Sequence, residues 1–173
     1  MTGPAGTGTR GPLVVGLGSP DRGDDAVGRA VARSVALLLP GVVVVDHEDP
    51  TSLLDLWDGH DPVVVVDAVR SGSPAGTLHR VETGAGGAPV SPGAWARTGH
   101  GGTHAVGLSE MVELGRALGR LPARLVVVGI EAECFDHGVP LTPRVAEAVP
   151  EAAARVCLEV GTALQEGAGD VPR

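Results

Sequence analysis

Between two apolar segments the chain reads Gly16-Leu-Gly-Ser-Pro-Asp-Arg-Gly-Asp-Asp-Ala-Val-Gly28, which is rich in glycine and carries three carboxylates. The residues before it, 13–15, are Leu-Val-Val and predict a buried strand. Apolar side chains at helical spacing follow it, at Val27, Val31, Val35 and Leu38. This segment is therefore a strand-to-helix crossover, and open α/β sheets hold their binding sites at such crossovers.

Further apolar runs predict buried strands at 42–45, 63–67 and 125–130. They lack polar alternation, which indicates burial on both faces and hence parallel strands covered by helices. A segment of mixed polarity, 76–82, is expected to form an edge strand. Helices are expected at 25–39, 51–57, 104–118 and 142–164, with a break or kink at Pro150. The pattern predicts a three-layer αβα sandwich around a mostly parallel, twisted sheet of about five strands.

The length of 173 residues and the hydrophobic content of 43% fit a single domain over 1–173, with flexible tails at 1–12 and 167–173. Glycine and proline dominate 83–102, which predicts a long loop. The net charge of −8 argues against nucleic acid as a partner, because phosphates need a basic surface. Since neither a membrane-spanning segment nor a signal peptide is visible, we expect a soluble, cytoplasmic protein without a membrane partner.

The crossover first suggests a dinucleotide-binding loop, because Gly16 and Gly18 follow a strand. Asp21 stands at the third glycine position of that motif, and Asp24 and Asp25 follow it. Carboxylates at a helix N-terminus repel a pyrophosphate, whereas they attract a cation. Nucleotide binding is therefore the less favoured hypothesis.

Three potential metal ligands are expected at one edge of the sheet. Asp25 follows the first strand, Asp67 ends the third, and His104 begins a helix. Because strand ends and helix starts meet at the carboxyl edge of a parallel sheet, two carboxylates and an imidazole would form a three-ligand site open to water or substrate. Each residue also has an interpretation without a metal: Asp25 would offset a helix dipole, and His104 would be a surface histidine. Asp67 would cap a turn at Ser71 or Ser73.

Five other histidines compete for the imidazole position: His47, His60, His79, His100 and His137. His47 follows a strand end and is the strongest rival, whereas His60 and His79 are expected to be solvated. His100 would gate the site from the long loop. The sequence contains neither H-E-x-x-H nor G-x-S-x-G, which excludes a helical zinc-protease motif and a serine nucleophile elbow.

Five stretches in chain order resemble the hydrogenase maturation proteases, endopeptidases that trim the C-terminus of the large subunit of nickel-iron hydrogenases. They are 16–28; Val66-Asp67-Ala68; Gly76-Thr77-Leu78-His79-Arg80; Thr103-His104-Ala105-Val106-Gly107-Leu108; and Val128-Gly129-Ile130-Glu131 followed by Leu141-Thr142-Pro143. The chain departs from the family at Ser19, where asparagine is usual, and at Ala26, where glycine is frequent.

The resemblance implies that Asp25, Asp67 and His104 are both the metal ligands and the catalytic residues. They would grip nickel that is already installed in the hydrogenase large-subunit precursor, with zinc or cadmium as surrogates. From its place in the crossover, each of Asp21 and Asp24 is instead expected to shape the turn or to cap the helix.

The implied reaction is an aspartyl-type or metal-dependent proteolysis without a nucleophilic side chain. The metal would polarise the scissile carbonyl or activate a water, or an aspartate would act as general base. The alternative is a non-catalytic, chaperone-like binder that checks the metal of the precursor. We expect a monomer whose 83–102 segment docks the precursor.

Overall fold

The computed structural model describes residues 9–87 and 104–167, and the side chains of 9–87 and 107–161. In chain order the elements are β1 (Leu13–Leu17), the 3-10 helix η1 (Gly23–Ala26), α1 (Val27–Leu38), β2 (Val43–His47), η2 (Pro50–Ser52), α2 (Leu53–Leu56), β3 (Val63–Val69), β4 (Leu78–Thr83), α4 (His104–Ala117), β5 (Leu125–Glu131) and α5 (Pro143–Gly167).

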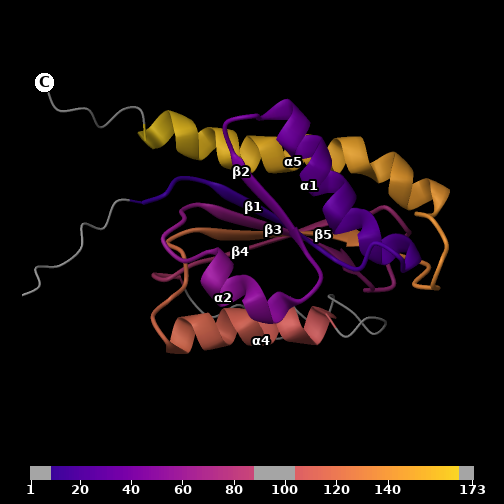
Figure 1. Cartoon of the computed structure of the whole chain (residues 1–173), viewed down its shortest axis with the longest axis horizontal. Coiled ribbons are helices and arrows are strands. Elements are labelled where there is room, and N and C mark those ends of the chain that lie inside the picture. Colours follow the sequence, from indigo (N-terminus) through magenta and orange to yellow (C-terminus); the bar gives the residue numbers. More distant parts are fainter. Residues whose placement is uncertain (1–8, 88–103, 168–173) are drawn as a thin grey trace, which may run out of the picture.

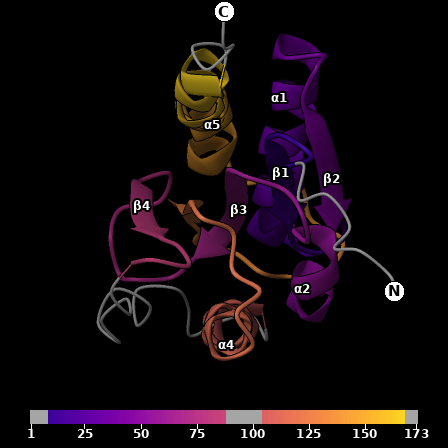
Figure 2. The same cartoon turned by 90° about the vertical axis from the view of Figure 1, so that its left-hand side faces the viewer.

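The five strands form one sheet in the order β2-β1-β3-β5-β4. All neighbours are parallel except β4, which runs antiparallel to β5 at the edge. Helices α1 and α5 cover one face, and α2 and α4 cover the other (Figure 1; Figure 2 shows the three layers end on). The predicted three-layer sandwich with a mostly parallel sheet is confirmed. The apolar runs of β3 and β5 are buried because helices cover both faces of these central strands. The prediction of a buried strand at 42–45 is wrong in its burial: β2 lies at the edge of the sheet, its residues are exposed or only partly buried, and Val43 is 46% exposed.

Alternate residues of β3 belong to different cores. Val64 and Val66 pack with α1 and α5, whereas Val63 and Val65 pack with Leu108 of α4 and with α2. Asp67 occupies the next position of the second set, so it lies on the α4 face of the sheet.

The glycines of the crossover allow α1 to lie directly on the sheet. A Cβ on Gly16 would stand 2.3 Å from the carbonyl oxygen of Gly28, and one on Gly28 would stand 2.3 Å from the Leu17 carbonyl oxygen. Gly18 has a φ of +126°, where other residues are strained. Backbone packing and geometry explain the glycine pattern without a phosphate ligand.

The predicted N-terminal tail, 1–12, includes residues that are fixed to the rest of the structure. Arg10 N–H donates to Gly59 O at 2.7 Å and Asp61 N–H donates to Gly11 O at 3.2 Å, which ties both residues to the chain before β3. Residues 1–8, 88–103 and 168–173 lie outside the described part of the chain. Most of the predicted 83–102 loop and the outer parts of both predicted tails are therefore untested.

Helix α5 continues through Pro150, and the break expected there is absent. Among the described residues, no helix combines the length and the apolar character needed to cross a membrane.

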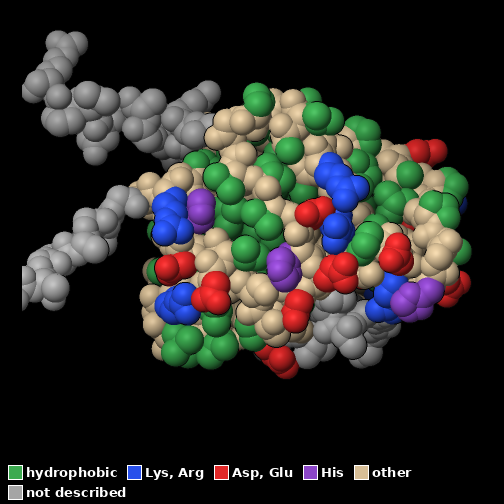
Figure 3. Space-filling model, in the orientation of Figure 1, with side chains coloured by type: hydrophobic (Ala, Val, Ile, Leu, Met, Phe, Trp, Pro, Cys, Tyr) green, Lys and Arg blue, Asp and Glu red, His purple; other side chains and the backbone are tan. Residues whose placement is uncertain are grey.

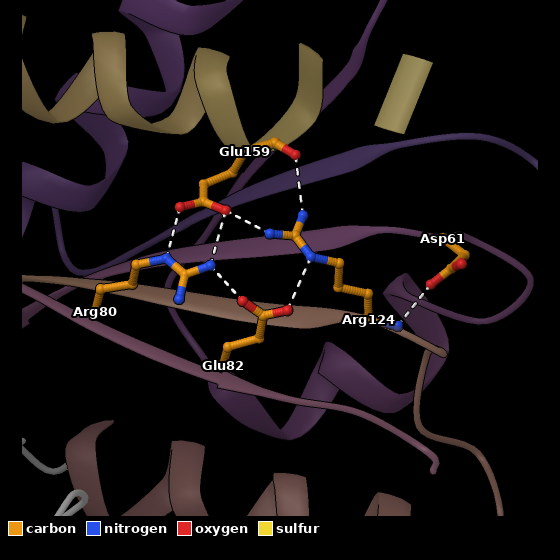
Figure 4. A network of polar contacts seen from close by, with 5 residues as sticks. All are labelled: Asp61, Arg80, Glu82, Arg124 and Glu159. Atoms are coloured by element: carbon orange, nitrogen blue, oxygen red, sulfur yellow. Dashed lines mark hydrogen bonds and ion pairs between the residues drawn. The ribbon is translucent and has the colours of Figure 1, made fainter. Parts of the chain in front are cut away.

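A network of four charged side chains fastens α5 to the β4–β5 edge (Figure 4). Arg80 Nε donates to Glu159 Oε1 at 2.6 Å, and Arg124 Nη2 donates to Glu159 Oε2 at 2.5 Å. Glu82 accepts from Arg124 Nε at 3.0 Å and also pairs with Arg80. The Arg80 hydrogen bond and then Arg124 outweigh burial and lower the pKa of Glu159 to about 2. This carboxylate is therefore ionised at neutral pH.

Candidate functional site

Two of the three predicted ligands meet at the carboxyl edge of the sheet. Asp25 lies in η1, directly after the crossover, and Asp67 lies in β3; they are 2% and 1% exposed. Burial, followed by the charge of Asp25, raises the pKa of Asp67 to about 8, while the Ala68 N–H opposes the rise. The two carboxylates are therefore close enough to influence each other electrostatically.

The carboxylate of Asp67 is only half satisfied. Its Oδ1 accepts the Ala68 N–H at 2.9 Å, whereas its buried Oδ2 has no hydrogen-bond partner among the described residues. The alternative role as a turn cap for Ser71 or Ser73 is not observed. A buried oxygen without a donor is costly, and a cation would satisfy it.

Asp25 is held by the crossover itself, since its Oδ2 accepts the Ser19 N–H at 2.8 Å. This contact uses the backbone of Ser19, so the departure from asparagine leaves the donor in place. Ala26 has a φ of −72°, an ordinary helical value, and its Cβ adds no backbone strain.

His104 is the first residue of α4, and its side chain lies outside the described residues. The helix packs on the face of the sheet that carries Asp67, which places its start on the correct side. Among the side chains that the structure describes, no group of three His, Cys, Asp or Glu residues is arranged to hold a metal. The complete triad thus remains a prediction.

Asp24 is completely buried and organises the backbone around Asp25. Its Oδ2 accepts the N–H groups of Glu133 and Cys134, both at 3.0 Å, and its Oδ1 accepts the Thr142 N–H at 2.7 Å. The Thr142 hydroxyl donates to the same carboxylate. Asp24 thereby fastens η1 to the segment between β5 and α5, in agreement with its predicted role in shaping the turn.

Glu131 is a buried acid that the sequence analysis did not single out. It ends β5 at 2% exposure and accepts Ser71 N–H at 2.7 Å, Gly72 N–H at 2.9 Å and the Ser71 hydroxyl at 2.7 Å. Although burial raises it, these hydrogen bonds and one from His79 hold the pKa of Glu131 below its usual value. The available signal was a carboxylate closing an apolar run, as at Asp67.

The expectation that His79 is solvated is wrong, and for His60 it holds only in part. The His79 side chain is 17% exposed and its Nε2 lies 3.1 Å from Glu131 Oε2, because the edge strand β4 pairs with the carboxyl end of β5. His60 is partly buried, with Nδ1 3.0 Å from Gly11 O.

Of the remaining rival histidines, His47 makes no recorded contact with the two aspartates, and the prediction for His100 is untested. His47 ends β2, which β1 separates from β3, and its Nδ1 accepts the Asp49 N–H at 3.2 Å. His100 lies outside the described residues.

Several solved hydrogenase maturation proteases have the same fold as this chain. The hydrogenase maturating endopeptidase HybD from Escherichia coli is 24% identical with a TM-score of 0.71, and the alignment covers 91% of this chain and 93% of that one. HybD from Thermococcus kodakarensis is 22% identical with a TM-score of 0.66, covering 87% and 99%. HycI from Thermococcus kodakarensis is 22% identical with a TM-score of 0.63, covering 87% and 92%. At these identities the likeness establishes the fold.

The sequence relationship is carried by the family model HycI, hydrogenase maturation protease, which matches residues 38–159. No individual curated protein matches the chain. Since the family match covers well over half of the sequence, this chain belongs to the hydrogenase maturation protease family.

Proposed function

We propose that this protein is an endopeptidase that removes the C-terminal extension of a nickel-loaded nickel-iron hydrogenase large-subunit precursor, and that it recognises the bound nickel. Family membership supports the endopeptidase role. The observation that carries the nickel-recognition part is the buried pair of Asp25 and Asp67, in which Asp67 Oδ2 has no donor among the described residues.

The chemistry of the pair suits a cation that arrives with the substrate. With a pKa of about 8, Asp67 holds a proton at neutral pH, and a metal ion must displace that proton to bind. This competition weakens binding of free metal ions. The nickel of a docked precursor is presented at high effective concentration, so Asp25, Asp67 and His104 would engage it only in the complex.

The same carboxylate suits proton transfer during peptide hydrolysis, because a general base works best with a pKa near the working pH. In this scheme the nickel of the docked precursor has displaced the proton of Asp67, a water oxygen then attacks the scissile carbonyl, and a proton of that water passes to the ionised Asp67 carboxylate. The C–N bond then breaks, and the proton passes to the leaving amine. Asp25, oriented by the Ser19 N–H, would hold the nickel beside the reacting carbonyl.

Processing of the precursor tests the proposal directly. The protein is mixed with nickel-loaded large-subunit precursor and with metal-free precursor, and the mass of the large subunit is measured. Shortening at the C-terminus with nickel, and none without it, is the expected result. A stable complex without shortening would instead support the non-catalytic metal-checking binder.

A thermal-shift screen tests the nucleotide alternative. Stabilisation by a dinucleotide, without any by nickel or by its surrogates cadmium and zinc, would favour that alternative. The monomeric state and the cytoplasmic location remain predictions that size-exclusion chromatography and cell fractionation would check.

A further inference from the structure

All 13 basic residues of the chain are arginines, and most of the described ones have an acidic partner. Those paired with a carboxylate are Arg29, Arg33, Arg80, Arg116, Arg120 and Arg124. On the face shown in Figure 3, basic side chains accordingly lie beside acidic ones. Within the described part of the chain, the arginines with no carboxylate partner are Arg10, Arg22, Arg70, Arg144 and Arg155.

Arg22 and Arg70 are distinguished from the other unpaired arginines by their place beside the candidate site. Arg22 precedes Asp25 by three residues in the crossover, and Arg70 follows Asp67 by three residues after β3. The two parts of the chain meet at the carboxyl edge of the sheet, since β1 and β3 are adjacent.

The side chain of Arg70 and the backbone beside Arg22 both contact the segment 133–139 that follows β5. Arg70 Nη2 donates to Glu133 O at 3.1 Å, and its guanidinium lies 4.9 Å from the centre of the Phe135 ring. Next to Arg22, Gly23 lies so close to this segment that a Cβ would stand 2.8 Å from the carbonyl oxygen of residue 134. Arg70 and the part of the crossover that carries Arg22 therefore lie against the same short segment.

The hydrogen-bonding capacity of these arginines is largely unused by the described residues. Arg22 Nε is buried and has no acceptor there, and a buried unsatisfied donor calls for a partner. Arg70 uses one N–H on a carbonyl, while its contact with the Phe135 ring fixes the plane of the remaining donors. Neither arginine offsets the burial of Asp67; among the described residues, the Ala68 N–H is the contact that lowers the pKa of Asp67.

We propose that Arg22 and Arg70 bind a carboxylate on the C-terminal segment of the precursor and so hold that segment across Asp25 and Asp67. The guanidinium fork matches a carboxylate in shape and charge. A net charge of −8 repels acidic peptides in general, so local positive charge is needed to dock one. This inference rests on the proposed function. The carboxylate comes either from an acidic side chain or from the chain terminus, and the experiment separates the two.

Binding is measured by fluorescence anisotropy with a labelled peptide that copies the C-terminal extension of the large-subunit precursor from the same genome. For the variant R22Q/R70Q we expect a dissociation constant at least about tenfold higher, and a higher KM for precursor processing with a kcat within about twofold. The matched control R10Q/R155Q removes the same two charges far from the site, and it should bind as the wild type does.

Two modified peptides identify the source of the carboxylate. Amidation of the C-terminus weakens binding if the terminal carboxylate is recognised, and replacement of Asp and Glu by Asn and Gln weakens it if side chains are recognised. Because Arg70 is exposed, the single variant R70Q shows the effect even if loss of Arg22 disturbs folding.

A dissociation constant for R22Q/R70Q or R70Q equal to that of R10Q/R155Q overturns the proposal, as does wild-type protein that does not bind the peptide. The peptide assay needs no cleavage, so its outcome is independent of the activity. If the wild type binds the peptide through Arg22 and Arg70 but leaves the nickel-loaded precursor intact, the protease proposal fails and the docking proposal stands.

Discussion

Glu159 and Asp67 are both buried carboxylates, yet the protein treats them in opposite ways. Glu159 receives charged hydrogen bonds from Arg80 and Arg124, which bring its pKa to about 2. Asp67 receives one backbone N–H and faces a second carboxylate, and its pKa rises to about 8. Burial is common to the two residues, so the neighbouring groups decide whether the acid is ionised.

The contrast separates a carboxylate with a structural role from one that we propose to be reactive. Both carboxylate oxygens of Glu159 accept hydrogen bonds from arginines of the fold, and these bonds link α5 to the β4–β5 edge. Asp67 retains an oxygen that no described group satisfies, and in the proposed function this oxygen would bind the substrate cation. Buried acids with unmet hydrogen-bonding capacity are where function is expected.

The largest effect is expected at Asp67. Replacement by asparagine keeps the shape and the acceptor for Ala68 N–H but removes the negative charge and the base. Processing of nickel-loaded precursor should fall at least about a thousandfold, measured by the rate of C-terminal shortening. Processing at near wild-type rate would remove Asp67 from the site.

Asp24 combines features of Glu159 and Asp67. Both of its carboxylate oxygens accept hydrogen bonds, as in Glu159, but it supports the loop that carries Asp25. In Asp24→Asn, either orientation of the amide turns its NH₂ group toward backbone N–H donors. We expect a loss of about 3 kcal/mol in the free energy of unfolding, measured in urea, together with slower processing. The exposed neighbour Asp21→Asn, with the same change of charge, should stay within about 0.5 kcal/mol of wild type. Equal stability of the two variants would contradict the role given to Asp24.

Glu159→Gln should cost stability without impairing catalysis. Arg80 and Arg124 are about one third exposed and screened by solvent, so we expect a loss of about 2 kcal/mol at pH 7. The pKa of Glu159 is lowered from 4.5, so its contribution is present above pH 4.5 and is lost as the pH falls toward 2. Urea unfolding at pH 7 and pH 3 measures the difference, with the exposed Glu151→Gln on the same helix as control. A fall in the kcat of precursor processing in Glu159→Gln would contradict the purely structural role given to Glu159.

The pH dependence of Asp67 should have the opposite sign. Its pKa rises from 3.8 in the unfolded chain to about 8 in the folded protein, so stability declines as the pH increases between these values. Asp67→Asn removes this decline. Between pH 5 and pH 8, the free energy of unfolding of the variant should rise relative to that of the metal-free wild type by on the order of 2 kcal/mol. The difference in melting temperature between the two proteins measures this gain. A gain that does not change with pH would show that Asp67 is ionised throughout.

Much of the fold could be predicted because it depends on local patterns. The valine runs at 42–45 and 63–66 indicate parallel strands, and the glycines at 16 and 28 mark a close crossover. The edge strand was expected at 76–82 and is found at Leu78–Thr83. The surroundings of His79 could not be predicted, because they depend on which part of β5 the edge strand meets.

The sequence by itself determined the fold class, the crossover, and the motifs that draw attention to Asp25, Asp67 and His104, because periodicity and motif order are properties of neighbouring residues. Only the tertiary structure decided which carboxylates are satisfied. Asp24 meets Thr142 across 118 positions and Arg80 meets Glu159 across 79. The charge state of a buried acid depends on such distant partners, and a linear pattern does not specify them.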